Sequence, residues 1–504
     1  MLFKIGKFQQ IAFILLTICY TCTGAFITNA FIFFEKDPII TCYNSEVLPF
    51  NCTRPEACKV ENNYTSIFHF EENITYSWTN DFKIECKDNY IIGLFGSLFF
   101  IGNMISVFTT ASYADYIGRL MIIKVSMLVR TLLILIYIFT SNKFITMIFL
   151  FLIGFINPMH STIPYILISE YVSHEERDDY MTLMFITESF SGIFCTIFFF
   201  IYQNWRAYII LNLIYGGIFL IFSFMLHESP RFLYSHKRYD EARLVYQNIG
   251  ILNGKGSKHI IFEKEEKENT EQLTQDNPSL AINEISDPKV DTKQDIKPKP
   301  EKEQTTAYST LFTNKKLRLL ILILPFIWFL DAFAFFIINF MIKYFKGGIY
   351  LNNSIIFISE VISYSISPKL MEKYGKRDTM IVCFGISGLA FFTFYFFDNI
   401  IIVYILVFFS KFGASVILNV SSLYTNESFP TDVRGRATAI CSFVGKLGGV
   451  FAPMLVELPI FKYMGIISGV LCFSASLMLL PLENKKLRSN MVDNSDQIEL
   501  DLIK

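Results

Sequence analysis

Long apolar runs separated by short polar stretches dominate the chain. Because a bilayer core of about 30 Å takes roughly 20 apolar residues in a helix, each run predicts one membrane-spanning helix. Six runs lie in the first half: Ile11–Phe34, Tyr90–Ser112, Met121–Thr140, Phe144–Ile168, Tyr180–Tyr202 and Trp205–Met225. Six lie in the second: Leu317–Ile342, Leu351–Pro368, Met380–Phe397, Ile400–Tyr424, Thr438–Leu458 and Phe461–Leu480. The first run is long and lacks a small-residue cleavage site, so we expect a retained helix.

Composition and loop charge support a multi-pass membrane protein. Of the 504 residues, 52% are hydrophobic and only 18% are charged, which is low for a soluble protein. Lys and Arg concentrate in the loops on one side, and this predicts that both termini are cytoplasmic. We expect the lipid bilayer, of the plasma membrane, as its surroundings. The net charge of −1 gives no indication of nucleic acid, and we expect none as a partner.

Two polar segments interrupt the helix pattern. Residues 35–89 hold Cys42, Cys52, Cys58 and Cys86 beside glycosylation triplets at Asn51, Asn63 and Asn73. This combination predicts an extracellular, glycosylated loop with two disulfides, in any of three pairings. Residues 227–316 predict a cytoplasmic linker, disordered over about 255–310. The remaining expected units are 1–34 with the first helix, 90–226, 317–480 and a cytoplasmic tail, 481–504.

An internal repeat relates the two halves. Asp115, Gly118 and Arg119 recur as Glu372, Gly375 and Lys376, while Glu170 and Arg177 recur as Glu427 and Arg434. Every pair is 257 residues apart. A duplication of six helices is the layout of secondary transporters that rock around a midplane site. We therefore interpret these residues as latches at the cytoplasmic side; the alternative is that their charges only fix topology.

Several motifs resemble the major facilitator superfamily, and within it the organic cation, organic anion and carnitine transporters. The matching stretches are "GKFQ" (6–9), "ECKDNY" (85–90), "ADYIGRL" (114–120), "HESPRFLYSHKRYDEA" (227–242), "WFLDAF" (328–333), "NESFPTDVR" (426–434), "GKLGGVFAP" (445–453) and "LPLENK" (480–485). The resemblance implies an all-α membrane protein with twelve transmembrane helices in two pseudo-symmetric six-helix bundles, the major facilitator fold. It also implies transport of small organic ions by alternating access.

Ionisable residues within the apolar runs are candidates for the substrate site. Away from the ends of the runs, the charged residues besides Arg130 are Glu188, Asp331, Glu360, Lys411 and Lys446. The resemblance places an acid and a base at Asp331 and Lys411, which we expect to form an intramembrane ion pair.

The other three charges leave the sign of the substrate open. Glu188, Glu360 and Lys446 sum to −1, which favours a cation or a zwitterion. The resemblance places the base of anion carriers at Lys446, which favours an anion. A third possibility is that Lys446 is locked to Glu188 or Glu360.

Uncharged residues complete the predicted substrate site. Trp328, Phe335 and Phe336 can form apolar walls for an organic ion, although packing is the simpler reading of most phenylalanines here. One predicted helix carries a polar stripe at spacings of three and four, which should face a cavity; its members are Asn157, His160, Ser161 and Tyr165.

The leading hypothesis is a monomeric secondary or facilitative carrier without a cofactor. The sequence shows no catalytic constellation and no metal-ligand spacing, so we do not expect an enzyme. Two alternatives share the fold: a membrane receptor or sensor that has lost transport, and a carrier of sugar or another solute. The helix at 317–342 lacks paired glutamines of the hexose-carrier type, which makes sugar the less favoured substrate.

Overall fold

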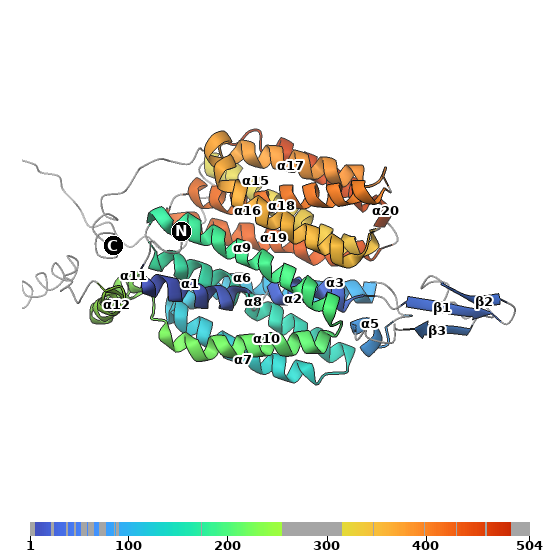
Figure 1. Ribbon diagram of the computed structural model, residues 1–504. Helices are drawn as coiled ribbons and strands as arrows, with labels where there is room; N and C mark the ends of the chain where they lie inside the picture. Colours follow the sequence, from blue (N-terminus) through green and yellow to red (C-terminus); the bar gives the residue numbers. More distant parts are fainter. Residues whose placement is uncertain are drawn as a thin grey trace, which may run out of the picture.

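The computed structural model describes residues 6–484 apart from 22–24, 37–38, 45–46, 52–57, 59–64, 70–76, 85, 87–89, 173, 255–314, 346, 398, 430 and 459–460. Its described helices form two bundles that lie side by side (Figure 1). The expected disordered part of the linker and the 485–504 tail lie outside the described residues.

The N bundle corresponds to the first six predicted helices. Its elements are α1 (Lys7–Tyr20), α2 (Phe26–Thr28), α3 (Phe31–Phe34), α6 (Tyr90–Ile117), α7 (Arg119–Ile138), α8 (Lys143–Tyr171), α9 (His174–Ile201) and α10 (Trp205–Phe222). The first predicted helix is thus divided into α1, α2 and α3. Two short linker helices follow, α11 (Pro230–Ser235) and α12 (Tyr239–Leu252).

The C bundle corresponds to the other six. Its helices are α15 (Lys315–Met341), α16 (Ile349–Tyr374), α17 (Lys376–Thr393), α18 (Ile400–Ser428), α19 (Thr431–Val456) and α20 (Phe461–Met478). Every predicted run therefore contains helix, and the all-α membrane fold is confirmed.

Eight described helices are long and apolar enough to cross a membrane by length and composition: α6 to α10, α15, α18 and α19. Helix α16 is less apolar because it carries buried polar residues, among them Asn353, Ser359 and Glu360. These side chains reach into the centre of the molecule, where the candidate site lies.

Two glycine turns repeat between the bundles. Gly118 separates α6 from α7 with φ +113°, and Gly375 separates α16 from α17 with φ +83°. Backbone of this kind favours glycine because it has no Cβ. The equivalent turns place Arg119 and Lys376 at the first positions of α7 and α17.

The loop before α6 contains a small antiparallel sheet that the sequence analysis did not predict. Its strands β1 (Ile39–Asn44), β2 (Val47–Asn51) and β3 (Thr65–His69) lie in the order β2-β1-β3. The strands project from one end of the bundles, which we call the loop end (Figure 1). Helices α11 and α12 lie at the opposite end, the linker end.

A disulfide within the loop and hydrogen bonds to the N bundle stabilise the loop before α6. Cys58 and Cys86 form a disulfide, one of those expected. Asp81, in the short helix α5 (Trp78–Asp81), accepts hydrogen bonds from Trp205 Nε1 at 2.7 Å and Arg206 Nε at 3.1 Å. Cys52, Asn63 and Asn73, and the side chains of Cys42 and Asn51, lie outside the description, so glycosylation and the second disulfide stay predictions.

Candidate functional site

The two bundles pack against each other tightly at the loop end. Ser97 of α6 donates to the carbonyl of Val450 in α19 at 2.7 Å, and Asn353 of α16 donates to Thr196 of α9 at 2.8 Å. Glycine makes the approach possible: a Cβ on Gly93 would lie 2.7 Å from the Pro453 carbonyl oxygen. The molecule is therefore closed at its loop end.

A buried charge cluster joins the bundles at the same end. Lys343 follows α15 directly; its ammonium lies 3.2 Å from Glu35 of the N bundle and also pairs with Glu457 at the end of α19. Tyr344 donates to the second oxygen of Glu457 at 2.8 Å. Sequence alone did not predict this cluster, because Glu35 and Lys343 each follow a predicted apolar run directly and Glu457 lies at the end of another.

The central lysine is paired, although not with the predicted acid. Lys411 of α18 lies 2.8 Å from Glu360 Oε1 of α16. Its ammonium also donates to the Phe335 carbonyl at 3.2 Å and to Asn339 Oδ1 at 3.0 Å. Phe335 contributes its ring as well, whose centroid lies 3.1 Å from the ammonium. These contacts offset the cost of burying Lys411 completely.

The predicted Asp331–Lys411 ion pair is therefore wrong for this conformation. Asp331 is buried on α15 and accepts instead from Ser421 Oγ at 3.4 Å. The physical reason is the position of α16, which brings Glu360 to the ammonium first. Glu360 also accepts from Ser189 of α9 at 2.9 Å, so the central pair touches both bundles.

Glu188 and Lys446 are the two remaining charges between the bundles. Glu188 accepts a hydrogen bond from Tyr20 at 2.6 Å. Lys446 is half-buried on α19, and within the described part of the chain its ammonium shows no hydrogen bond or ion pair. It is therefore not locked to Glu188 or Glu360. The charge of Glu188 still acts on Lys446, so an acid and a base share this region without a direct pair.

A pocket lies beside the central pair at the bundle interface. Its lining comes from both bundles: Thr28, Asn29, Ile32, Phe100, Phe336, Asn339, Phe340, Asn353 and Phe357. Asn339 lines the pocket and also binds Lys411, so pocket and ion pair are neighbours. Aromatic rings with a few amide groups are the mixture that small-molecule sites use, although the pocket, of about 10 Å³, has room for only about one water molecule in this conformation.

The three predicted aromatic walls have different positions. Phe336 lines the pocket. Phe335 contacts Lys411, as described, and Trp328 donates to Thr425 Oγ1 within the C bundle at 2.9 Å. Trp328 also packs against Gly445, one residue from Lys446.

The predicted polar stripe on α8 divides into two parts. Asn157 and His160 are buried, and His160 bonds Ser126 of α7 at 2.9 Å. Ser161 donates to the carbonyl of Asn157 in its own helix. Tyr165 contacts Phe185, which stacks on Tyr364 of α16. Tyr165 is thus the member of the stripe that the described ring contacts connect to the bundle interface.

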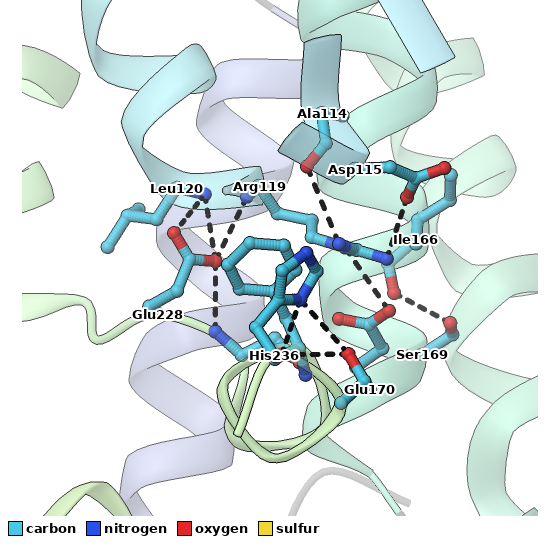
Figure 2. A network of polar contacts seen from close by, with 12 residues as sticks. Ala114, Asp115, Arg119, Leu120, Ile166, Ser169, Glu170, Glu228 and His236 are labelled. Atoms are coloured by element: carbon cyan, nitrogen blue, oxygen red, sulfur yellow. Dashed lines mark hydrogen bonds and ion pairs between the residues drawn. The ribbon is translucent and has the colours of Figure 1, made fainter. Parts of the chain in front are cut away.

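A polar network holds the linker end of the N bundle (Figure 2). Arg119 pairs with Asp115 at 3.1 Å and with Glu170 of α8 at 3.5 Å. Glu228, just before α11, accepts from the backbone N–H groups of Arg119 at 3.0 Å and Leu120 at 3.1 Å. It satisfies amides that the start of α7 would otherwise leave open. The sequence analysis quoted the Glu228 motif without giving this residue a role.

The C bundle repeats the arrangement with different residues. Lys376 pairs with Glu427 of α18, and Asn484 donates to the Tyr374 carbonyl at 2.9 Å and to Asp378 at 2.7 Å. Asn484 lies against Gly375 as Glu228 lies against Gly118. Glu372 is exposed, Arg177 is half-buried, and the Arg434 side chain lies outside the description.

Both linker-end ion pairs join helices within one bundle. Arg119–Glu170 connects α7 to α8, and Lys376–Glu427 connects α17 to α18. Their described contacts therefore fix helices inside each bundle, and gating by these residues stays a prediction. Among the described residues, no cluster of three His, Cys, Asp or Glu side chains could hold a metal ion.

Comparison with known proteins agrees with the architecture. The model of the Major Facilitator Superfamily matches residues 75–453 and 329–491. The solved structure of the xylose transporter XylE from E. coli, in its inward open conformation, has the same fold: the TM-score is 0.62 at 14% identity, covering 96% of this chain and 97% of that one.

Curated relatives include transporters of the solute carrier 22 family and organic cation/carnitine transporters. Solute carrier family 22 member 15-like of Xenopus tropicalis is 24% identical over 443 residues, 85% of this chain and 84% of that protein. Organic cation/carnitine transporter 2 of Homo sapiens is 22% identical over 381 residues, 75% of this chain but 63% of that protein. Organic cation/carnitine transporter 5 of Arabidopsis thaliana is 24% identical, covering 90% of this chain and 83% of its own length. The predicted resemblance is confirmed: the chain belongs to the Major Facilitator Superfamily, is a multi-pass membrane transporter rather than an enzyme, and has organic cation/carnitine transporters among its relatives.

Proposed function

We propose that this protein carries small organic ions that bear both a positive and a negative group, across the plasma membrane and as a monomer. The observation that carries the proposal is the half-buried Lys446 ammonium without a direct partner in the described chain, in the electrostatic range of Glu188. The other central base, Lys411, is already neutralised by Glu360.

The charges favour a zwitterion over a simple anion. An anionic group bound at Lys446 would lie in the field of Glu188, and a cationic group of the same molecule would compensate that field. Two of the relatives are named for organic cations and carnitine, and carnitine has both an ammonium and a carboxylate. The aromatic and amide lining of the neighbouring pocket suits an alkylammonium group by its chemistry. The pocket, of about 10 Å³ in this conformation, has room for about one water molecule, so the bundles must separate before such a group enters.

Transport follows from the two bundles and the site between them. With the loop end outside the cell, as the cysteine-bearing loop and the loop charges predict, the described conformation is closed to the exterior. Rocking of the bundles would separate Lys343 from Glu35 as the outer end opens. The Lys343 ammonium would remain paired with Glu457, which avoids the cost of an unpaired buried charge.

Ligand-induced thermal stabilisation of the purified full chain tests the substrate class. L-Carnitine, tetraethylammonium and benzoate represent zwitterion, cation and anion. A ligand that binds the folded state raises its unfolding temperature, and we expect the largest rise with L-carnitine. Lys446→Ala should reduce that rise, whereas Lys373→Ala, at an exposed position near the end of α16, should not. A larger response to benzoate or tetraethylammonium would contradict the zwitterion preference.

A receptor or sensor of the same fold would also be stabilised by its ligand. Saturable uptake into vesicles distinguishes the two, because a sensor binds the ligand without accumulating it inside.

A further inference from the structure

Asp331 is a fully buried carboxyl group with almost no hydrogen bonding. The residue is 1% exposed. Its Oδ2 accepts one long hydrogen bond of 3.4 Å from Ser421, and its Oδ1 has no partner among the described residues. An ionised carboxylate has two oxygens that each accept readily, and leaving them unsatisfied away from water is costly.

The nearest base cannot supply the missing bonds in this conformation. An ammonium has three N–H donors, and Lys411 directs them at Glu360 Oε1, the Phe335 carbonyl and Asn339 Oδ1. Lys411 is 0% exposed, so no water-facing donor remains. The Asp331 carboxyl feels the charge of Lys411 without receiving a proton donor from it.

The other helices packed around Asp331 bring no further positive group among the described residues. Helix α18 presents Ser421 and Lys411. Helices α16 and α20 present the neutral groups of Tyr364 and Cys472. Helix α19 meets α15 through Gly445 and Gly448. Lys446 lies between these glycines, but among the described residues the only charge that acts on Asp331 is that of Lys411.

We infer that Asp331 is a proton-binding site, which holds its carboxyl group in the neutral, protonated form while Lys411 is bound to Glu360. The bound proton turns Oδ1 or Oδ2 into a hydroxyl and removes the buried negative charge. Two carboxyls, one ammonium and one proton then sum to zero. With Asp331 neutral, the charge of Lys411 is balanced by Glu360 alone.

Resting on the proposed function, this site couples the proton to the cationic group of the substrate. A positive group that reaches Asn339 when the bundles separate repels Lys411, which donates to that amide. Lys411 then moves from Glu360 to Asp331. The O–H bond of Asp331 breaks, its electron pair stays on the carboxylate, and the proton passes to water in the cavity. Glu360 can then pair with the cationic group of the substrate. One proton is released for each substrate cation that binds.

Infrared spectroscopy of the reconstituted full chain tests the proton site without any substrate. At neutral pH the wild type should show a C=O stretching band of a protonated, shielded carboxylic acid. Asp331→Asn should remove the band, because it replaces the carboxylic acid with a neutral amide of the same shape. Asp115→Asn, at an exposed acid of the linker end, should leave it unchanged. Absence of the band in the wild type, or its persistence in Asp331→Asn, would overturn the inference.

A second variant covers the case that Asp331→Asn does not fold. Ser421→Ala removes the one hydrogen bond to the carboxyl and should shift the frequency of the band. An unshifted band would mean that it arises from another acid, which contradicts the assignment.

Vesicle uptake of tetraethylammonium tests the coupling. Wild-type vesicles should exchange tetraethylammonium for protons, read by an internal pH dye, whereas Asp331→Asn leaves Lys411 no second carboxylate and should lose both the uptake and the proton flux. Uptake by the wild type without proton flux would overturn the coupling alone. Lack of any tetraethylammonium uptake together with an intact infrared band would overturn the coupling to a simple cation, while the proton site would stand and uptake of L-carnitine would still decide the proposed function.

Discussion

The Lys411 ammonium can be buried only because its partners compensate its charge. Its ammonium is enclosed by Glu360, Asn339 and Phe335 at 0% exposure. Removing one member of a buried pair usually costs about 3–5 kcal/mol because the other charge is left uncompensated, whereas removing both is much cheaper. The stability of the central helices should therefore depend on the pair and not on either charge alone.

A double-mutant cycle tests this dependence. We predict that Lys411→Met and Glu360→Gln each lower the thermal stability of the purified protein clearly, and that the double variant recovers most of the loss. Charge reversal of both residues should likewise be tolerated better than reversal of Lys411 together with Asp331. Additive losses in the Lys411–Glu360 cycle would show that the two groups do not interact.

Helix starts at the linker end depend on residues far away in sequence. Glu228 accepts from the first two backbone amides of α7, and loss of such a cap costs about 0.5–2 kcal/mol. We predict that Glu228→Ala lowers stability by this amount and that Glu228→Gln, which keeps one acceptor oxygen, lowers it less. Thermal unfolding of the two variants measures the difference; equal stability of Glu228→Ala and wild type would remove the capping role.

The loop-end cluster should control which side of the molecule opens. Lys343–Glu35 crosses between bundles, while Lys343–Glu457 joins α19 to the end of α15 within one bundle. We predict that Glu35→Gln exposes the pocket to the loop side. The Lys343–Glu35 pair stabilises only the closed conformation, so its loss should favour the open one. Each 1.4 kcal/mol shifts the equilibrium about tenfold.

Labelling of a cysteine placed at Asn29, which lines the pocket, measures that exposure. An impermeant thiol reagent added from the loop side should react faster in Glu35→Gln. Glu457→Gln is the matched control: it removes a pair that both forms keep, so the labelling rate should change less. Equal acceleration in the two variants would contradict a gating role for Glu35.

At the scale of the whole molecule, hydropathy and the repeat were sufficient to predict the bundles. Apolar length alone located the helical segments of both bundles, though not the short helices α5, α11 and α12 outside them. The recurrence of Gly118 at Gly375 corresponds to equivalent turns with positive φ in both halves. Asp331 and Lys411 were assigned to each other from the family resemblance. Sequence gives the depth of a residue in a helix but does not show which neighbouring helix brings a partner closest. The rotation of α16, which aims Glu360 at Lys411, depends on packing among several helices.

Contacts between distant segments were also beyond the sequence. Glu228 capping α7 and Lys343 joining Glu35 to Glu457 connect residues whose separation carries no periodic signal. Lys446 was identified from sequence because a single cation in an apolar run is costly wherever the helix faces.

The central claim is that Lys446 binds the anionic group of a transported small organic ion. Uptake of labelled L-carnitine into vesicles containing the purified full chain tests it most directly. We predict saturable uptake by the wild type, a loss of at least about tenfold in kcat/KM for Lys446→Ala, corresponding to about 1.4 kcal/mol of binding, and relatively improved uptake of tetraethylammonium by Lys446→Asp. Unchanged uptake and unchanged selectivity in both Lys446 variants, with Lys373→Ala behaving as wild type, would contradict the account.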